Sequence, residues 1–175
     1  SICSTAVVPP IPGVKEAYAA GTLVTSRELL NVKTAPKSLV IVGGGVIGVE
    51  FATVFNAFGS KVTIIEKMDG ILPTMDDEVR VAYTKRLKAD GIEVLTGSEV
   101  KSVAGTKLTY NLDGKDTTVD SDLILMAVGT RANTGGMEKL NVKMDRANII
   151  TDEYLRTSVP GVYAIGDVNG KFMLA

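Results

Sequence analysis

The stretch Leu39-Val40-Ile41-Val42-Gly43-Gly44-Gly45-Val46-Ile47-Gly48 sets a short apolar run directly before a glycine-rich turn. The apolar run is flanked by turn residues, as a strand buried on both faces should be. Residues 46–58 are apolar almost all round and predict a buried helix, which Gly59 ends in the left-handed position. The side chains expected on its core face are Phe51, Val54, Phe55 and Phe58. The stretch therefore predicts strand, turn and helix in immediate succession.

The same pattern continues toward the C-terminus with two more strands and another helix. Residues 62–66 and 92–95 are short apolar runs that predict strands. Between them, acidic residues 76–78 and basic residues 85–88 carry charges that complement a helix dipole, and Gly91 ends this helix. The residues expected to form its core stripe are Val79, Ala82, Tyr83 and Leu87.

The segments on either side of this core differ in character. Residues 1–37 are expected to be extended or irregular because of Pro9, Pro10 and Pro12, apart from a short helix through residues 28–30 that Ser26 would cap. Between about 98 and 121 apolar and polar residues alternate around Asp113-Gly114, which predicts a small antiparallel meander. Residues 122–127 return as a buried strand. This order predicts an α/β fold, with a Rossmann-like parallel sheet, helices on it and a small antiparallel β-meander.

The glycine turn fits the dinucleotide-binding pattern G-x-G-x-x-G through Gly43, Gly45 and Gly48. Such a match is weak alone and gains meaning from the strand before it and the helix after it. Gly43 would allow the tight turn, Gly45 would let the backbone approach a pyrophosphate, and Gly48 would let helix and strand pack closely. The helix N-terminus would offer N–H groups and a partial positive charge to the phosphates. The alternative is a glycine-rich turn that binds nothing.

An acidic residue stands where a dinucleotide site needs one. Glu66 ends the second predicted strand, 18 residues beyond Gly48. Its carboxylate can accept hydrogen bonds from both adenosine ribose hydroxyls and would repel a 2′-phosphate. This favours NAD over NADP, although Lys67 beside it could tolerate a phosphate.

Composition and charge exclude several classes of function. Apolar residues make up 45% and charged residues 22%, a globular balance, and a formal net charge of -1 predicts no nucleic-acid or membrane partner. No apolar run approaches the roughly 20 residues of a transmembrane helix, and we expect no signal peptide. The single cysteine, Cys3, excludes an internal disulfide and favours a cytoplasmic location. With no histidine, a metal site is not expected.

Four stretches together are more specific than the glycine turn alone. They are residues 42–50, residues 62–66, Ala127-Val128-Gly129-Thr130-Arg131-Ala132-Asn133, and residues 157–168, which end in Ala164-Ile165-Gly166-Asp167-Val168. In these stretches, and in the final Met173-Leu174-Ala175, the chain resembles the central part of the flavin-dependent pyridine nucleotide–disulfide oxidoreductases. Within that family it is most similar to the dihydrolipoyl dehydrogenases. The resemblance implies an FAD/NAD(P)-binding fold in an NAD-dependent oxidoreductase.

The resemblance assigns roles position by position. The residues that would hold the NAD pyrophosphate are Gly43, Gly44, Gly45, Val46, Ile47 and Gly48. Glu66 would bind the ribose, Val100 and Gly129 would line the NAD site, and Glu50 would lie near the nicotinamide beside a lysine of the flavin domain. Asp167 and Ala175 would contact FAD. Each role has a plainer alternative: a surface charge for Glu50, a strand-end turn for Gly129, core packing for Val100 and a cap for Asp167.

The resemblance also implies that parts of the family's polypeptide lie outside this chain. In the family, the flavin domain carries a redox-active Cys-x4-Cys pair and the dimerisation domain carries a catalytic His-Glu pair. Neither pair is found in this sequence, so no catalytic residue is assigned. Cys3 is expected to have no redox role. We expect residues 1–37 to be a connector from the FAD domain, 38–150 the NAD-binding domain and 151–175 a return segment. Alone, the chain should bind NAD weakly, retain no FAD and be inactive.

In the intact relative, dihydrolipoamide would reduce the disulfide and electrons would pass through FAD to NAD+. The partners implied are the FAD and dimerisation domains and the lipoyl domains of 2-oxo acid dehydrogenase or glycine cleavage complexes.

Without the flavin domain, residues 161–165 would expose apolar surface or an unpaired strand edge. This segment would fold back on residues 5–12 or pair with a second copy of the chain. Two rival interpretations remain: another member of the family (an NADH oxidase, a mercuric reductase or a coenzyme A disulfide reductase) or a stand-alone NAD-binding module.

Overall fold

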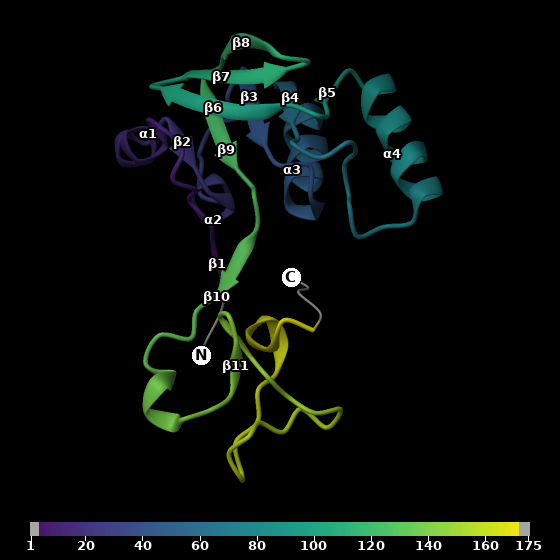
Figure 1. Ribbon diagram of the computed structural model, residues 1–175. Coiled ribbons are helices and arrows are strands. Elements are labelled where there is room, and N and C mark those ends of the chain that lie inside the picture. The colour runs from purple at the N-terminus through teal and green to yellow at the C-terminus, as the bar shows by residue number, and fades with distance from the viewer. Residues whose placement is uncertain (1–3, 172–175) are drawn as a thin grey trace. The chain divides into compact units, whose positions relative to one another are not determined.

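The computed structural model describes residues 4–171 and groups them into two compact units (Figure 1). The larger unit is Val7–Gly129. The smaller unit joins residues 4–6 to residues 130–171. Each unit has its own buried side chains.

The larger unit is built on a five-stranded parallel sheet with the order β2-β9-β3-β4-β5. Its strands are β2 (Leu23–Val24), β9 (Leu123–Met126), β3 (Ser38–Val42), β4 (Lys61–Ile65) and β5 (Glu93–Leu95). Leu39 in the central strand lies beside Val62 on one side and Leu123 on the other, which fixes the register. The strands predicted at 39–42, 62–66, 92–95 and 122–127 are confirmed to within a residue or two.

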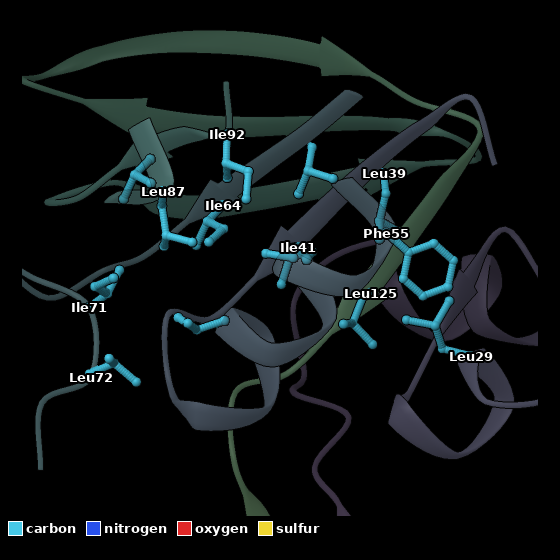
Figure 2. Close-up of a cluster of buried hydrophobic side chains, with 14 of the residues drawn as sticks. Leu29, Leu39, Ile41, Phe55, Ile64, Ile71, Leu72, Leu87, Ile92 and Leu125 are labelled. Atoms are coloured by element: carbon cyan, nitrogen blue, oxygen red, sulfur yellow. The ribbon is translucent and has the colours of Figure 1, made fainter. Parts of the chain in front are cut away.

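Helices cover one face of this sheet. They are α2 (Ser26–Leu29), α3 (Val46–Ala57) and α4 (Asp77–Ala89). Leu39 and Ile41 point toward this face, where they are fully buried with side chains from the neighbouring strands and helices (Figure 2). The labelled members of this cluster are Leu29, Leu39, Ile41, Phe55, Ile64, Ile71, Leu72, Leu87, Ile92 and Leu125. Burying each such side chain contributes about 1.5–3 kcal/mol to the stability of the folded chain. Because β3 is held in this way, the glycine turn that follows it starts from a fixed position.

A three-stranded meander covers the opposite face with help from one short helix (Figure 1). It consists of β6 (Glu99–Ala104), β7 (Lys107–Leu112) and β8 (Lys115–Asp120), and the helix is α1 (Val14–Ala20). Val40 and Val42 alternate with the residues of the helix-covered face and are buried beneath the meander beside Leu108. Asp113 and Gly114 have φ values of 53° and 79°, as a mirror-image hairpin turn requires. The predicted fold class is confirmed.

The smaller unit is built from short elements. β1 (Ser4–Ala6) pairs antiparallel with β10 (Thr130–Ala132), and β11 (Met144–Asp145) pairs antiparallel with β12 (Asn148–Ile149). Two single-turn 3-10 helices, η1 (Met137–Leu140) and η2 (Gly166–Asn169), complete it. Its buried cluster consists of Ala132, Ala147, Ile149, Ala164 and Val168.

Two predictions about the N-terminal segment were wrong. Residues 14–20 are not irregular but form α1, because Val14 and Ala17 are buried against the sheet. The short helix α2 exists, yet its cap is Thr25 and not Ser26. The backbone N–H of Thr25 donates to the Glu28 carboxylate at 2.9 Å, which completes a capping box.

The two compact units have other bounds than the predicted domains 1–37, 38–150 and 151–175. Strand β2 belongs to the central sheet, and residues 130–150 group with 151–171.

The predicted core faces of both long helices were partly wrong. On α3, Phe55 is buried, but Val54 and Phe58 are 45% and 68% exposed. The helix meets the sheet through Val49, Ala52 and Phe55, and an almost uniformly apolar helix gives no periodic signal to identify that face.

On α4, Leu87 is buried and Tyr83 packs against the core, whereas Val79 is 48% exposed and Ala82 is exposed as well. The N-terminal turns of α4 therefore contribute little to the core. The predicted stripe holds only toward the C-terminal end of the helix.

Residues 161–165 do not form a strand beside residues 5–12, as one alternative predicted. Thr5 pairs with Arg131, and Tyr163 makes an isolated bridge with Arg156. The expected exposed apolar surface is present, because Tyr163 and Ile165 are 62% and 70% exposed. Among residues 4–171, no helix is long and apolar enough to cross a bilayer.

Candidate functional site

The candidate site lies where the parallel strands of the larger unit end. The chain runs from β3 through α3 to β4 and then to β5 on one side of the sheet, whereas β9 returns on the other side of β3. The connections therefore diverge at β3, and in open α/β sheets ligands bind at this switch point beside the carboxyl ends of the strands. The turn Gly43–Gly48 leaves β3 at this point, directly before α3.

Three glycines of the turn are required by the fold itself. Gly43 has a φ of 110°, and a Cβ built on it would lie 2.3 Å from the Ala127 carbonyl oxygen. A Cβ on Gly44 would lie 2.7 Å from a side-chain methyl of Ile71. A Cβ on Gly48 would lie 2.0 Å from the Gly43 carbonyl oxygen. A side chain at Gly43 or Gly48 would require the backbone to move, and one at Gly44 would require the buried Ile71 side chain to shift.

Gly45 differs from its neighbours. Its φ of -73° and ψ of -178° suit any residue. Among residues 4–171, nothing lies within 4 Å of a Cβ built on it. Packing and backbone strain therefore give no reason for a glycine here, although glycine is preferred over alanine at a helix N-cap such as this one. A side chain at Gly45 would extend into the open space in front of the turn.

The N-terminus of α3 opens onto this space. Its first backbone bond runs from the Val49 N–H to the Gly45 carbonyl at 3.0 Å, so the N–H groups of the preceding residues have no intrahelical acceptor. The first turn of α3, as the structure describes it, holds no acidic residue to offset the positive end of the helix dipole. Val46 is 44% exposed and Ile47 is half-buried at this end. The arrangement suits an anion.

Glu66 follows the end of β4 and turns its carboxylate back to the glycine turn. One carboxylate oxygen, Oε2, accepts the Gly44 N–H at 2.5 Å, and the other, Oε1, accepts the Met68 N–H at 2.7 Å. A carboxylate has about four acceptor sites, so two remain for further donors. The side chain is half-buried and held from two sides. It is therefore already fixed in position to accept hydroxyl groups.

A loop after Glu66 closes against the same turn. The Leu72 N–H donates to the Gly44 carbonyl at 2.7 Å, and Ile71 and Leu72 are buried. Leu72 has a φ of 52°, a left-handed conformation that costs a leucine on the order of 1–3 kcal/mol. The surrounding contacts hold this strained residue, and strain of this kind is concentrated at ligand sites.

Arg80, on α4, holds this loop through hydrogen bonds and ion pairs of its side chain. Its Nε donates to the Ile71 carbonyl at 3.0 Å, and its guanidinium pairs with Asp77 at 2.8 Å and Asp69 at 3.3 Å. The Arg80 side chain is only 22% exposed, and a Cβ on Gly70 would lie 2.4 Å from its Nη2. The position of Ile71 against the glycine turn therefore depends on Arg80.

Lys67, next to Glu66 in the sequence, forms an ion pair with Glu99. Its ammonium lies 2.8 Å from the Glu99 carboxylate at the start of β6, and Glu99 also pairs with Lys101. Hydrogen bonds from Lys101 and Lys67 lower the pKa of Glu99 to about 2, and the Glu99 carboxylate raises the pKa of Lys67. Lys67, the residue that could tolerate a 2′-phosphate beside Glu66, is therefore paired with the Glu99 carboxylate.

The other predicted site residues of the larger unit fall into two groups. Glu50 is exposed on α3, one helical turn beyond Val46, and Gly129 is exposed after β9 with a φ of 118°. Gly129 accepts the Val7 N–H at 3.0 Å. Val100, by contrast, is half-buried in β6 against the core under the meander, which favours its role in core packing.

Asp167 lies in the smaller unit, in η2. Its carboxylate accepts the Ser4 hydroxyl at 2.8 Å, which links β1 to η2 across most of the sequence. It does not act as a side-chain cap of η2, whose N-cap is Ile165. Ala175, predicted to contact FAD, and Cys3 lie outside the described residues.

Ile71, Leu72 and Arg80 were not predicted from the sequence as residues of the site. Ile71 and Leu72 form an apolar pair between Gly70 and Pro73, and a buried apolar pair within a loop is the one sequence signal that could have identified them. Arg80 gave no signal, because its partners depend on how the loop folds against α4. Among residues 4–171, no three His, Cys, Asp or Glu side chains gather as a metal ion would need.

Comparison with known proteins gives the site its context. The profile of the pyridine nucleotide-disulphide oxidoreductase family matches residues 3–175. A dihydrolipoyl dehydrogenase from Acholeplasma laidlawii is 77% identical over 172 residues, which cover 98% of this chain and 51% of that relative. One from Mycoplasma genitalium is 41% identical over 166 residues, covering 94% of this chain and 36% of that relative. The chain therefore spans about half or less of the length of these relatives.

Two solved structures share the fold. The HOCl-induced flavoprotein disulfide reductase RclA from Escherichia coli matches with a TM-score of 0.84 and 31% identity, over 98% of this chain and 39% of that one. Reduced Bacillus anthracis CoADR-RHD matches with a TM-score of 0.80 and 25% identity, over 94% of this chain and 30% of that one.

Proposed function

The chain belongs to the pyridine nucleotide-disulphide oxidoreductase family, and from this premise we propose that it is the NAD-binding part of a dihydrolipoyl dehydrogenase. The observation that carries the NAD assignment is Gly45. Its backbone conformation and surroundings would accept a side chain, so its lack of one is explained by a ligand that approaches the backbone. The high identity to dihydrolipoyl dehydrogenases supports the choice of enzyme within the family.

The residues of the larger unit fit the two halves of the adenosine diphosphate portion of NAD. The pyrophosphate would lie against Gly45 at the N-terminus of α3, where unpaired N–H groups and the helix dipole favour negative charge. The ribose would donate its two hydroxyl groups to the free acceptor sites of Glu66, which Gly44 and Met68 already hold in place. A 2′-phosphate at the same point would meet a carboxylate, which supports NAD over NADP.

The remaining assignments extend this proposal. Glu50, one turn along α3, would lie beside the nicotinamide, and Gly129 would line its pocket. NAD, when bound, accepts a hydride from the reduced flavin. In the whole enzyme, Asp167 and Ala175 would contact FAD, whose domain is expected from the rest of the polypeptide. This chain alone would bind NAD weakly, retain no FAD and have no dihydrolipoamide activity.

The partners and location of the whole enzyme follow from the same assignment. We expect the FAD and dimerisation domains of the same polypeptide, together with lipoyl domains of a 2-oxo acid dehydrogenase or glycine cleavage complex, in the cytoplasm. The exposed side chains of Tyr163 and Ile165 would be covered by those domains or, in the isolated chain, by a second copy. A lipoamide turnover assay of this chain tests the assignment, because activity without added flavin domain would contradict it.

A second candidate, a stand-alone NAD-binding module, draws support from one observation. The glycine turn, Glu66 and the loop held by Arg80 all lie in the larger unit, which has buried clusters on both faces of its sheet. Such a module would bind NADH tightly without any flavin domain. A Kd for NADH that stays unchanged when the missing polypeptide is supplied would favour this candidate over the dehydrogenase fragment.

The Gly45→Ala variant tests the NAD site directly. We expect the far-UV circular dichroism to stay unchanged and the Tm to fall by only about 2–4 °C, because alanine is a poorer helix N-cap than glycine. NADH affinity in calorimetric titration should fall at least about tenfold, since a methyl group would occupy the pyrophosphate space. Gly135→Ala is the matched control. Gly135 also lies outside the left-handed region, and a Cβ there would meet only the Asn133 amide oxygen at 3.8 Å, so neither stability nor affinity should change.

Two outcomes would contradict this assignment. NADH binding by Gly45→Ala equal to that of the unaltered chain would show that nothing approaches Gly45. Equal affinity for NADH and NADPH in the unaltered chain would contradict the role of Glu66.

A further inference from the structure

The segment after Glu66 is held beside the segment before Glu99 by backbone hydrogen bonds. The Ser98 N–H donates to the Glu66 carbonyl at 2.9 Å, and the Gly97 N–H donates to the Met68 carbonyl at 2.8 Å. This places Lys67 and Glu99 next to each other, although β5 separates them in the sequence. Their ion pair of 2.8 Å therefore follows from the backbone arrangement.

Lys67 occupies a position where a free cation would change the choice of cofactor. It follows directly after Glu66, and its four-carbon stem allows the ammonium to reach groups bound at the rim of that carboxylate. A cation near this point is what accommodates the 2′-phosphate of NADP in dinucleotide-binding folds. The Lys67 side chain is 72% exposed, so solvent does not bar it from such a ligand.

Glu99 holds Lys67 in a different arrangement. One carboxylate oxygen pairs with Lys67 and the other with Lys101. Hydrogen bonds from the two ammonium groups lower the pKa of Glu99 to about 2, so it stays ionised well into the acid range. This pairing acts against NADP and leaves the neutral ribose hydroxyl groups of NAD unaffected.

We propose that Glu99 is a specificity-determining residue: by holding the Lys67 ammonium, it withdraws the cation that a 2′-phosphate would pair with and strengthens the preference for NAD(H). This inference rests on the proposed function, since it concerns the same adenosine site. It assigns to the first residue of the meander a role in cofactor choice that Glu66 alone does not account for.

The test compares NADH and NADPH affinities of single and double variants of the 175-residue chain. Glu99→Gln releases Lys67, so we expect NADPH affinity to rise about three- to tenfold, because exposed ion pairs are weak, while NADH affinity changes less than twofold. In Glu99→Gln with Lys67→Met the gain should disappear. Glu16→Gln, an exposed glutamate on α1, changes the net charge equally and should leave both affinities unchanged.

The gain should also shrink with salt, because the released ammonium would act through its charge. Unchanged NADPH affinity in Glu99→Gln, with NADH binding intact, would overturn this inference and leave the proposed function standing. A gain that persists in the double variant would also overturn it, since Lys67 would then not be the agent. Absence of NADH binding by the unaltered chain would overturn the proposed function, and this inference with it.

Discussion

The two units of this chain bury their side chains in different ways. The larger unit places a regular parallel sheet between two apolar clusters, one beneath helices and one beneath the meander. The smaller unit has one cluster of five buried residues, three of them alanines, and its sheets have two strands each. Since apolar burial is the main source of stability, the larger unit should be much harder to open than the smaller one.

This difference separates the predicted nucleotide contacts into two classes. Gly45 and Glu66 lie on backbone that β3, β4 and the clusters hold, so their geometry should persist in the isolated chain. Asp167 lies in the smaller unit, where its carboxylate accepts the Ser4 hydroxyl of β1. A site for NAD can therefore be largely preformed here, whereas a contact to FAD would depend on groups that this chain does not supply.

The largest expected effect comes from the core of the larger unit. Leu125 in β9 is fully buried among side chains from the helix-covered face (Figure 2). Leu125→Ala should lower the free energy of unfolding by about 3 kcal/mol, from lost transfer energy and the cavity left behind. That corresponds to a fall in Tm of roughly 10 °C for a chain of this size, measured by thermal circular dichroism.

The control for this variant is Val128→Ala, three residues along the chain and 41% exposed. It should change the free energy of unfolding by less than about 0.5 kcal/mol. Similar losses in the two variants would mean that the loss at Leu125 does not depend on its burial, and burial would then not explain a difference in stability between the units.

A smaller effect, confined to one unit, is expected from Ile149→Ala. Ile149 is the largest aliphatic side chain of the five-residue cluster, so its truncation should open the smaller unit. In hydrogen exchange, we expect the Ala164 and Thr157 amides to lose nearly all protection, since they bond to Leu155 and Val162 within that unit. The Ala127 amide, which bonds to Val42 in the larger unit, should keep its protection. Equal loss in both units would show that they unfold together.

The sequence predicted the larger unit better than the smaller one, for a physical reason. Strands buried on both faces, such as β3, are continuous apolar runs between turn residues, and that signal does not depend on distant partners. The hairpin at Asp113-Gly114 is equally local. In the smaller unit the strands are two or three residues long, and their pairing depends on segments far apart in the sequence, as for Thr5 and Arg131.

Site residues could be predicted where the position in the sequence restricts the residue type. They could not be predicted where they act through tertiary contacts. The positions of Gly43 and Glu66 directly after two strands were predicted from the sequence, and the structure places them there. The hydrogen bond from Arg80 to Ile71 could not be predicted, because Arg80 lies on α4 and its partner is a backbone carbonyl in the preceding loop. Helix α1 was missed because the prolines before it dominated the local pattern, while only Val14 and Ala17 tie it to the core.

The smallest expected effect is a pH response in the smaller unit. The Asp152 carboxylate accepts N–H groups from Tyr154 and Arg156 at 2.9 Å and pairs with the Arg156 side chain, and these bonds lower its pKa. Because the folded pKa lies below the unfolded value of about 3.9, this turn is stabilised above that pH and loses the contribution as pH falls through the folded value. The Tyr154 and Arg156 amide shifts in NMR should therefore titrate with a midpoint below about 3.9.

Asp152→Asn provides the check on this titration, because it keeps an acceptor oxygen but removes the charge. The acid transition of the Tyr154 and Arg156 amide shifts should vanish in this variant, while amides of the larger unit are unaffected. A midpoint at or above 3.9 in the unaltered chain would mean that the turn around Asp152 is open in solution. The smaller unit would then be weaker than its buried cluster suggests, and the contrast with the larger unit correspondingly greater.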